Sequence, residues 1–355
     1  MSAGAPSYSV QLDREAFNNP EKWYVRHIWR QIAERRAQKI PKDHIKLLTL
    51  PGVECFDIRL LNEYGLIKTT ASGFDPDGLA FCEEVPERFT RISNLLPNAR
   101  RFRGTYESLI GVGRASYTGT ADRWFPFDVI NLDFSGPGFK QPDRSTSKTA
   151  EALLKTFRLQ KAKKGSFSFF LTLPADPYMN DVSGKSELEK CLRDNLHQNE
   201  NDFSQLFYSK YPQIRGNSRP AYKTMHYSDF LLITVPKIII KYGSTEWFRV
   251  ECTKKMTYVG EGHTTRMVSF CFECEYIGLL EGYGKSPRMD ELKKGYVQNV
   301  MKIMIEPNLD INTYLDSRKE TRKELSRIRD EARELFGKRL NESSATALRT
   351  LQNAC

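Results

Sequence analysis

One acidic residue stands where a buried strand would present it to a ligand. Residues 127–133 (Phe-Asp-Val-Ile-Asn-Leu-Asp) have the apolar content of a buried strand, and Asp133 ends that run. Phe134 and Ser135 then lead into a Gly-Pro turn. Because ligands of open α/β sheets bind beyond the carboxyl ends of the strands, we predict a catalytic or cofactor-binding site at Asp133, Phe134 and Ser135.

Two other strand ends carry residues suited to a nucleoside ligand. The loop after a first strand needs a small residue so that the backbone can approach the ligand, and Gly52, just before a predicted helix, provides one. Asp75 follows the predicted second strand about 20 to 25 residues later, where a carboxylate can accept hydrogen bonds from both hydroxyls of a ribose. An aspartate in this position is equally explained as a turn residue or a helix N-cap.

The sequence lacks the motifs of several other enzyme classes. The sequence has no Gly-x-x-x-x-Gly-Lys-Ser/Thr loop, no Gly-x-Gly-x-x-Gly after a strand and no Gly-x-Ser-x-Gly elbow, which argues against a kinase, a dehydrogenase and a serine hydrolase. The histidines show no metal-ligand spacing, and the seven scattered cysteines argue against a disulfide framework. Cys271 and Cys274 lie on a predicted strand, where residues three apart face opposite sides, so we predict no metal site.

The elements that must position these residues alternate between strand and helix. The apolar patterns predict strands at 45–50, 68–74, 100–104, 127–133 and 166–173, with helices at 54–64, 79–96 and 146–159. A late helix at 227–242, whose Ile-rich second half also suits a strand, precedes a hairpin of strands 246–258 and 267–277. The alternation predicts a parallel sheet with right-handed crossovers, and the hairpin separates it from the six-stranded order of dinucleotide dehydrogenases.

The pattern predicts three regions. Residues 1–43 form a basic helical extension, with a helix over 20–39 whose cations either face solvent or contact phosphates. Residues 44–277 form the α/β domain, with insertions at 110–125 and 175–224. The second insertion mixes cations with aromatic residues, as expected where bases stack and phosphates are neutralised, although a structural lid also uses aromatics. Residues 278–355 form a helical extension.

Charge and composition bound the partners. The net charge of +10 and pI near 9.1 favour an anionic partner such as RNA or DNA, although solubility also explains such a charge. No apolar stretch reaches the roughly 20 residues that span a bilayer, and residues 1–20 lack a signal-peptide pattern, so we expect a cytoplasmic protein without membrane contact. Residues 318–339 are dense in both charge signs, which suggests an exposed or coiled helix. A partner protein or self-association through the C-terminal helices is a further possibility.

The ordered strand ends resemble one family more than any single motif does. Over residues 44–277 the chain resembles the class I S-adenosylmethionine-dependent methyltransferases. The features that carry this resemblance are Pro51-Gly52, Asp75-Pro76, Thr105-Tyr106, Asp133-Phe134-Ser135-Gly136 and the hairpin. This resemblance implies an α/β fold with a Rossmann-like, mostly parallel seven-stranded sheet, a terminal antiparallel hairpin, and N- and C-terminal helices. It also implies S-adenosylmethionine as cofactor.

The resemblance assigns roles to individual residues. Gly52, with Pro51 and Glu54 in the same loop, would lie near the methionine end of the cofactor. Asp75 and Pro76 would hold the ribose, and Thr105-Tyr106 would flank the adenine. Asp133, Phe134 and Ser135 would face the methyl-accepting atom, since the run 128–136 looks most like the Asp-x-Asp-Pro-Phe-Gly run of tRNA guanine-N2 methyltransferases. Such a turn accepts protons from an exocyclic amine, whose lone pair then attacks the methyl group.

The sequence departs from the family pattern in three places. The usual Gly-x-Gly after the first strand is replaced by residues 50–54, Thr105 stands where an acid often follows the third strand, and no proline follows Asp133 directly. Two hypotheses therefore remain. One is a methyltransferase that acts on a nucleic-acid base amine, and the other is a methyltransferase-like scaffold without catalytic activity that binds nucleic acid or a protein partner.

Overall fold

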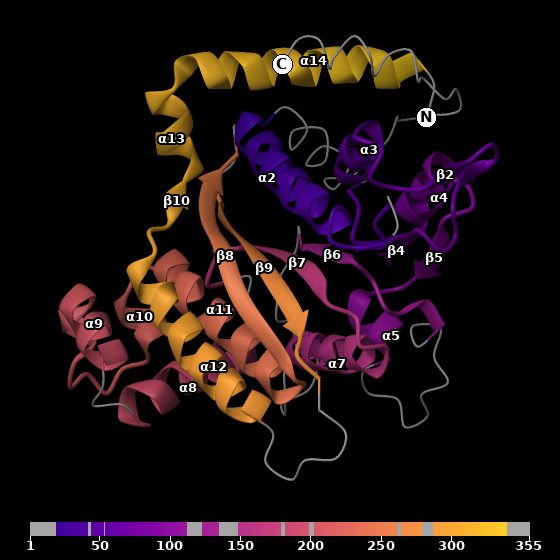
Figure 1. Cartoon of the computed structure of the whole chain (residues 1–355). Helices are drawn as coiled ribbons and strands as arrows, with labels where there is room; N and C mark the ends of the chain where they lie inside the picture. The colour runs from indigo at the N-terminus through magenta and orange to yellow at the C-terminus, as the bar shows by residue number, and fades with distance from the viewer. Residues whose placement is uncertain are drawn as a thin grey trace, which may run out of the picture.

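A twisted eight-stranded sheet forms the centre of the protein. The computed structural model describes residues 19–41, 44–52, 54–111, 123–134, 148–178, 182–198, 202–260, 264–278 and 287–338. Across the sheet the strands run in the order β10-β8-β9-β7-β6-β1-β4-β5 (Figure 1). Their bounds are β1 Leu47–Thr49, β4 Leu79–Glu83, β5 Arg100–Arg103, β6 Val129–Asp133, β7 Phe167–Pro174, β8 Phe248–Val259, β9 Arg266–Tyr276 and β10 Leu309–Asp310. The fold is α/β, as predicted.

The sheet is parallel except at one strand. Neighbouring strands pair in parallel from β5 through β4, β1 and β6 to β7. β9 pairs antiparallel with both β7 and β8, so it is inserted between two strands that point the same way. The predicted hairpin is therefore confirmed. The predicted number of seven strands is wrong by one, because β10 pairs in parallel with β8 and extends the sheet.

The predicted second strand is wrong. Residues 68–74 form only the small hairpin of β2 (Thr69–Thr70) and β3 (Gly73–Phe74), which lies outside the main sheet. The second strand of the sheet is β4, which we expected to begin a helix, and that helix starts only at Pro86. A short apolar run such as Leu-Ala-Phe-Cys does not distinguish a buried strand from a buried helix by its periodicity, and this ambiguity caused the error.

Helices cover both faces of the sheet (Figure 1). On one side lie α2 (Pro20–Ala37), α3 (Phe56–Glu63), α4 (Pro86–Leu95) and α13 (Ile311–Ser317), and α14 (Lys319–Lys338) packs against α2 outside them. On the other side lie α5 (Tyr106–Ile110), α7 (Lys148–Ala162), α11 (Tyr227–Thr245) and α12 (Pro287–Ile305). Outside them, α8 (Val182–Gln198) packs against α11, and α9 (Asp202–Lys210) packs against α12. Each side of the sheet has its own hydrophobic core, and successive residues of a strand point into opposite cores. In β7, Phe169 and Leu171 face one core, and Phe170 faces the other.

The predictions for the remaining elements have mixed outcomes. The late helix is helical throughout, as α11, and Cys271 and Cys274 do face opposite sides of the sheet. Most of the first insertion lies outside the described residues, whereas the second forms α8, α9, the 3-10 turn η1 (Pro212–Ile214) and α10 (Ala221–Thr224).

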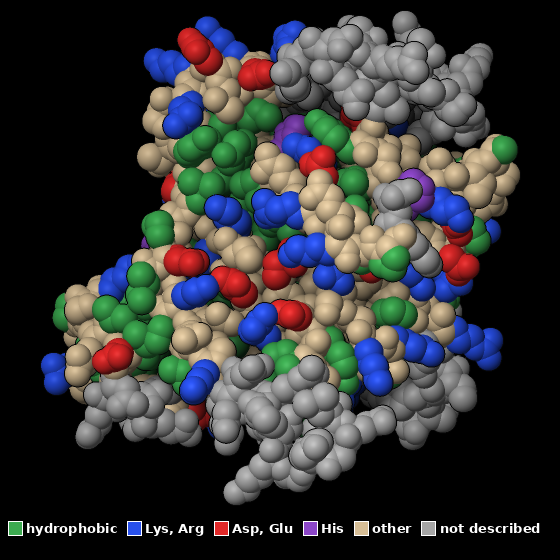
Figure 2. All heavy atoms as spheres, viewed as in Figure 1, with side chains coloured by type: hydrophobic (Ala, Val, Ile, Leu, Met, Phe, Trp, Pro, Cys, Tyr) green, Lys and Arg blue, Asp and Glu red, His purple; other side chains and the backbone are tan. Residues whose placement is uncertain are grey.

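Within the described residues, no helix is long and apolar enough to cross a membrane. The face in Figure 2 shows basic and acidic side chains interspersed.

Close packing of α11 on the sheet makes Gly243 a sensitive position. A Cβ atom there would lie 2.1 Å from Val250 Cγ2 and 3.2 Å from Phe157 Cε1. We expect Gly243→Ala to lower the free energy of unfolding by about 1–3 kcal/mol, because overpacking outweighs the gain of about 1 kcal/mol in helix propensity. Gly295→Ala in α12, whose Cβ would meet only Arg249 at 3.7 Å, should be neutral or stabilising. Urea unfolding of both variants checks this, and a more stable Gly243→Ala protein would contradict it.

Candidate functional site

The carboxyl ends of the five parallel strands meet at one edge of the sheet. The pairing registers set Thr49 beside Phe81 and Asn131, and Asp133 beside Thr172. Seven of the predicted site residues follow strand ends on this edge: Pro51, Gly52, Glu54, Thr105, Tyr106, Asp133 and Phe134. The rings of Tyr106 and Phe134 meet edge to face, with centroids 6.4 Å apart. Ser135 lies outside the described residues.

Asp75 and Pro76 do not belong to this edge. They precede β4 instead of following a strand of the main sheet, so they lie at the amino end of β4, opposite Asp133. Asp75 acts there as a turn residue: its carboxylate pairs with Lys68 at 2.8 Å and accepts a hydrogen bond from the backbone N–H of Asp77 at 2.7 Å. The hydrogen bond from Lys68 is the main cause of a lowered Asp75 pKa. The error follows directly from the misplaced second strand.

The acid that ends the second sheet strand is Glu83. Its Oε1 atom accepts a hydrogen bond from Val85 N at 2.9 Å, and its Oε2 atom lies 3.6 Å from Arg88 Nε. The side chain is 11% exposed. The sequence contained a signal for this assignment, because an apolar run that ends in two glutamates is followed by Val85-Pro86, and proline favours the first turn of a helix.

The described residues do not pack tightly around Gly52 in the loop after β1. A Cβ atom on Gly52 would meet none of their atoms within 4 Å, so this packing does not require glycine. Glu54 forms an ion pair with Arg91 of α4, which ties this loop to the next helix. Thr105 caps α5 by accepting a hydrogen bond from Ser108 N at 3.2 Å. Tyr106 is buried and its hydroxyl bonds to Thr156, so only its ring contributes to the edge.

Asp133 is held by a lysine from the N-terminal helix. Lys22 Nζ lies 2.5 Å from Asp133 Oδ2, and the two side chains are 9% and 17% exposed. The ammonium also lies 5.1 Å from the ring centroid of Trp29 and 5.7 Å from that of Tyr258. Burial lowers the pKa of Lys22, but the attraction of Asp133 and Tyr258 outweighs it, so the pKa is raised. The ion pair therefore joins α2 to the end of β6 through two mostly desolvated charges.

A second ionic contact lies beneath the first. Arg26 Nε is 3.6 Å from Asp57 Oδ1, and Asn131 donates a hydrogen bond to Asp57 Oδ2 at 3.1 Å. Burial raises the pKa of Asp57, with Arg26 opposing that shift and Asp133 adding to it. The adjoining cavity, of about 10 Å³, is bounded by these side chains and by Trp29. That volume accommodates about one water molecule, so a nucleoside has no room under α2.

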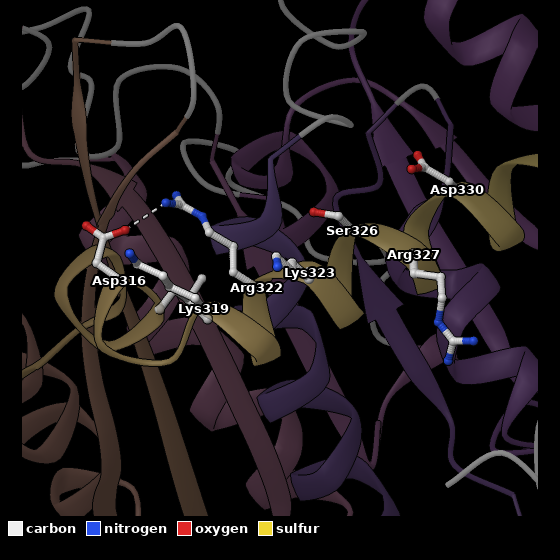
Figure 3. Close-up of a pocket in the computed structure, with 8 residues that line it drawn as sticks. Asp316, Lys319, Arg322, Lys323, Ser326, Arg327 and Asp330 are labelled. Carbon is white, nitrogen blue, oxygen red and sulfur yellow. Dashed lines mark hydrogen bonds and ion pairs between the residues drawn. The ribbon is translucent and has the colours of Figure 1, made fainter.

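The C-terminal helix supports α2 from outside. Glu21, adjacent to Lys22, is 1% exposed and forms an ion pair with Arg322 of α14. Arg322 Nη1 also lies 2.7 Å from Asp316 Oδ1, and Figure 3 shows these two side chains pointing toward each other. They belong to an open groove of about 740 Å³ lined by α13 and α14. Charge contacts thus run from α14 through α2 to the end of β6.

Family membership comes from the sequence match. A family model described as PP_RS20740-like matches residues 100–335, from β5 into α14. The chain belongs to the PP_RS20740-like family. No curated protein matches its sequence. The matched range includes Asp133, Tyr258 and Arg322, whereas Lys22 precedes it.

The buried ion pair predicts strong coupling between α2 and β6. Lys22→Met leaves Asp133 without its counter-charge, and we expect a loss of about 2 kcal/mol or more in the free energy of unfolding. The double variant with Asp133→Asn should lose less than the sum of the single variants, with a coupling of at least about 1 kcal/mol. Lys302→Met is the control, because Lys302 pairs with Glu251 at the same 2.5 Å but with both side chains over 40% exposed. It should change stability by less than about 1 kcal/mol. Additive losses in chemical unfolding would refute the coupling.

Burial of His27 in α2 predicts a stability loss in acid. Burial first, and then Arg30, lower its pKa to about 4 from the ordinary 6.5. Below pH 6.5 the unfolded chain binds a proton that the folded protein does not, so folding stability falls by about 3 kcal/mol between pH 6.5 and 4. His27→Leu should remove this part of the pH dependence, and His44→Leu should not. Unfolding curves measured between pH 4 and 6.5 test this prediction. If the free energy of unfolding of the His27→Leu variant depends on pH as steeply as that of the wild type, His27 is not the residue responsible.

Proposed function

We propose that this protein is a class I S-adenosylmethionine-dependent methyltransferase that acts on an amine of a nucleic-acid base. The observation that carries the proposal is the strand order: five parallel strands, then β8 with the antiparallel β9 inserted beside β7. Acidic side chains end β4 and β6 on either side of the Gly52 loop. This is the arrangement that the sequence resemblance implies for a cofactor and a methyl acceptor.

The residues at this edge suit the cofactor in three respects. Because no described atom lies within 4 Å of a Cβ on Gly52, a ligand could approach the backbone there, which the resemblance puts near the methionine end. Glu83 replaces Asp75 as the acid for the ribose hydroxyls, since it ends the strand next to β1. Thr105, at the end of β5, stays the residue proposed to flank the adenine. Bound S-adenosylmethionine would supply an electrophilic methyl group.

Asp133 would orient the methyl acceptor. Lys22 holds Asp133 Oδ2, and within the described residues no partner is found for Oδ1. An exocyclic amine that donates a hydrogen bond to Oδ1 would have its lone pair directed away from the carboxylate. The ring of Phe134, packed against Tyr106, would limit the positions open to the base. Alignment of this kind is the main source of rate acceleration in a transfer between two bound groups.

Cofactor binding tests the proposal directly. Titration calorimetry with S-adenosylmethionine should show binding to the full chain. Glu83→Gln should weaken it about tenfold or more, because it removes a charged acceptor for two hydroxyls. Glu84→Gln is the matched control, since Glu84 is the next residue, is exposed and undergoes the same charge change. Asp75→Asn should also leave binding intact. Absence of binding at millimolar cofactor would overturn the proposal.

Methyl transfer tests the role of Asp133. Transfer of labelled methyl groups to RNA or DNA should be lost in Asp133→Asn, whereas cofactor affinity should stay within a few-fold. Unfolding curves for this variant are the necessary control, because Asp133 also pairs with Lys22. Full transfer by a folded Asp133→Asn protein would remove the proposed role.

A second function is favoured by the ion pairs themselves. Asp133 is paired with Lys22, and Glu83 already accepts a hydrogen bond from Val85 N and contacts Arg88. A scaffold that binds nucleic acid or a protein without catalysing transfer would keep both acids for structural reasons. Binding to nucleic acid that needs no cofactor and weakens steeply with salt, together with no methyl transfer, would favour this alternative.

A further inference from the structure

The second insertion contains a run of cations without acidic neighbours in sequence. No aspartate or glutamate occurs between Asp202 and Asp229. The run contains Lys210, Arg215, Arg219 and Lys223, all exposed. In the part of the chain that the structure describes, none of these four forms an ion pair with a carboxylate. We call the surface formed by α9, η1, α10 and the loop between them the insertion platform.

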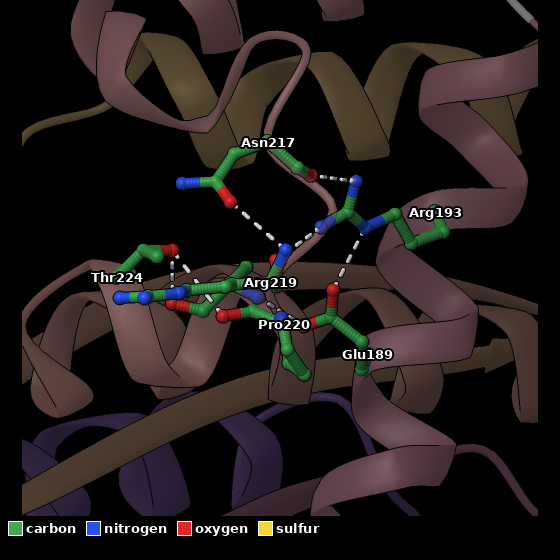
Figure 4. Close-up of polar contacts among 7 residues, drawn as sticks. Glu189, Arg193, Asn217, Arg219, Pro220 and Thr224 are labelled. Atoms are coloured by element: carbon green, nitrogen blue, oxygen red, sulfur yellow. Dashed lines mark hydrogen bonds and ion pairs between the residues drawn. The ribbon is translucent and has the colours of Figure 1, made fainter.

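The backbone of the platform is held in place by α8. Arg193 of α8 donates hydrogen bonds to Arg219 O at 2.8 Å and Asn217 O at 3.4 Å, and pairs with Glu189 at 2.8 Å (Figure 4). Glu189 in turn accepts a hydrogen bond from Ala221 N at 2.9 Å. Arg193 and Glu189 are thereby engaged with backbone atoms and with each other. The cations of the insertion platform are therefore carried on backbone that these two side chains hold in place.

The aromatic residues of the platform divide into two groups. Phe207 and Tyr211 are buried in the core, so the hypothesis that they stack on bases is wrong. Tyr208 and Tyr222 are only half-buried. Arg215 lies 5.8 Å from the ring centroid of Tyr208, and Lys223 lies 6.0 Å from that of Tyr222. Each of these two partly exposed rings therefore has a platform cation within 6.0 Å of its centroid.

The insertion that carries the platform is attached at the edge of the sheet that bears Asp133. The insertion leaves the sheet at Pro174, two residues beyond Thr172, which pairs with Asp133. It returns at Tyr227 into α11, which must run back to the amino edge before β8 begins at Phe248. Both ends of the insertion are thus attached at the edge proposed to hold the methyl acceptor.

We propose that the insertion platform binds the phosphate backbone of single-stranded nucleic acid, with Tyr208 and Tyr222 as stacking surfaces for its bases. This inference rests on the proposed function for the choice of partner. Fixed cations interleaved with partly exposed rings are the combination that single strands require, because unpaired bases expose their faces to aromatic side chains. A duplex offers no exposed base faces, so it would use the cations but leave the rings without a role.

Binding of labelled oligonucleotides to the full chain tests the platform. The platform variant changes Lys210, Arg215, Arg219 and Lys223 to glutamine. The control variant makes the same charge change at exposed lysines elsewhere, Lys163, Lys164, Lys254 and Lys323. Fluorescence anisotropy with a short mixed-sequence RNA should show at least about tenfold weaker binding for the platform variant, with the salt slope reduced by about 0.7 per lost contact. The control variant should stay within a few-fold of the wild type.

Tyrosine variants separate base stacking from charge alone. Tyr208→Leu keeps an apolar side chain against Phe207 but removes the ring. It should weaken binding of the oligonucleotide about tenfold and leave binding of inorganic polyphosphate unchanged. Equal losses in the platform and control variants, tighter binding of the matching duplex, or no binding by the wild type would each overturn the proposal. Tighter binding of an acidic peptide than of the oligonucleotide would also overturn the proposal, and would indicate a protein partner instead.

The platform and the proposed function fail separately. Oligonucleotide binding that depends on the platform, without cofactor binding, would support the platform and remove the methyltransferase. Cofactor-dependent methyl transfer that the platform variant leaves unchanged would support the enzyme and remove the platform.

Discussion

The ion pair between Lys22 and Asp133 is the contact on which the arrangement of the predicted site depends. It joins the first turn of α2 to the end of the fourth strand in chain order of the parallel set, and both side chains are mostly removed from water. Two charges are stable in such a place only when they pair with each other, because an unpaired one would pay its full desolvation cost. Asn19 caps α2 and Pro20 begins it, so the helix presents Lys22 to the sheet edge within its first turn.

The same helix connects distant parts of the chain. Glu21 points to Arg322 of α14, while Lys22 points to Asp133, so neighbouring residues link the C-terminal helix to the sheet edge. Beneath them Arg26 and Asp57 form a second contact around a cavity too small for a cofactor. A ligand of nucleoside size therefore has no room beneath α2, whereas no described atom lies within 4 Å of a Cβ placed on Gly52.

The aromatic residues of the second insertion differ in burial. Phe207 and Tyr211 anchor it in the core. Its four cations remain at the surface, on backbone that Arg193 and Glu189 hold in place. The aromatic residues therefore do not act as a single group, since burial removes two of them from any contact with a partner.

Much of the architecture follows from the sequence alone. The long hairpin and β7 have continuous apolar or alternating patterns, and these were predicted to within a few residues, as was the position of Asp133 at a strand end. The second strand was not, because Leu79–Cys82 is too short for its periodicity to separate strand from helix. Only the tertiary structure showed that Glu83, and not Asp75, lies at the carboxyl edge of the sheet, and that Lys22 pairs with Asp133. Local patterns determine which segments bury which faces, whereas a contact between residues over a hundred positions apart depends on how the helices pack across the sheet.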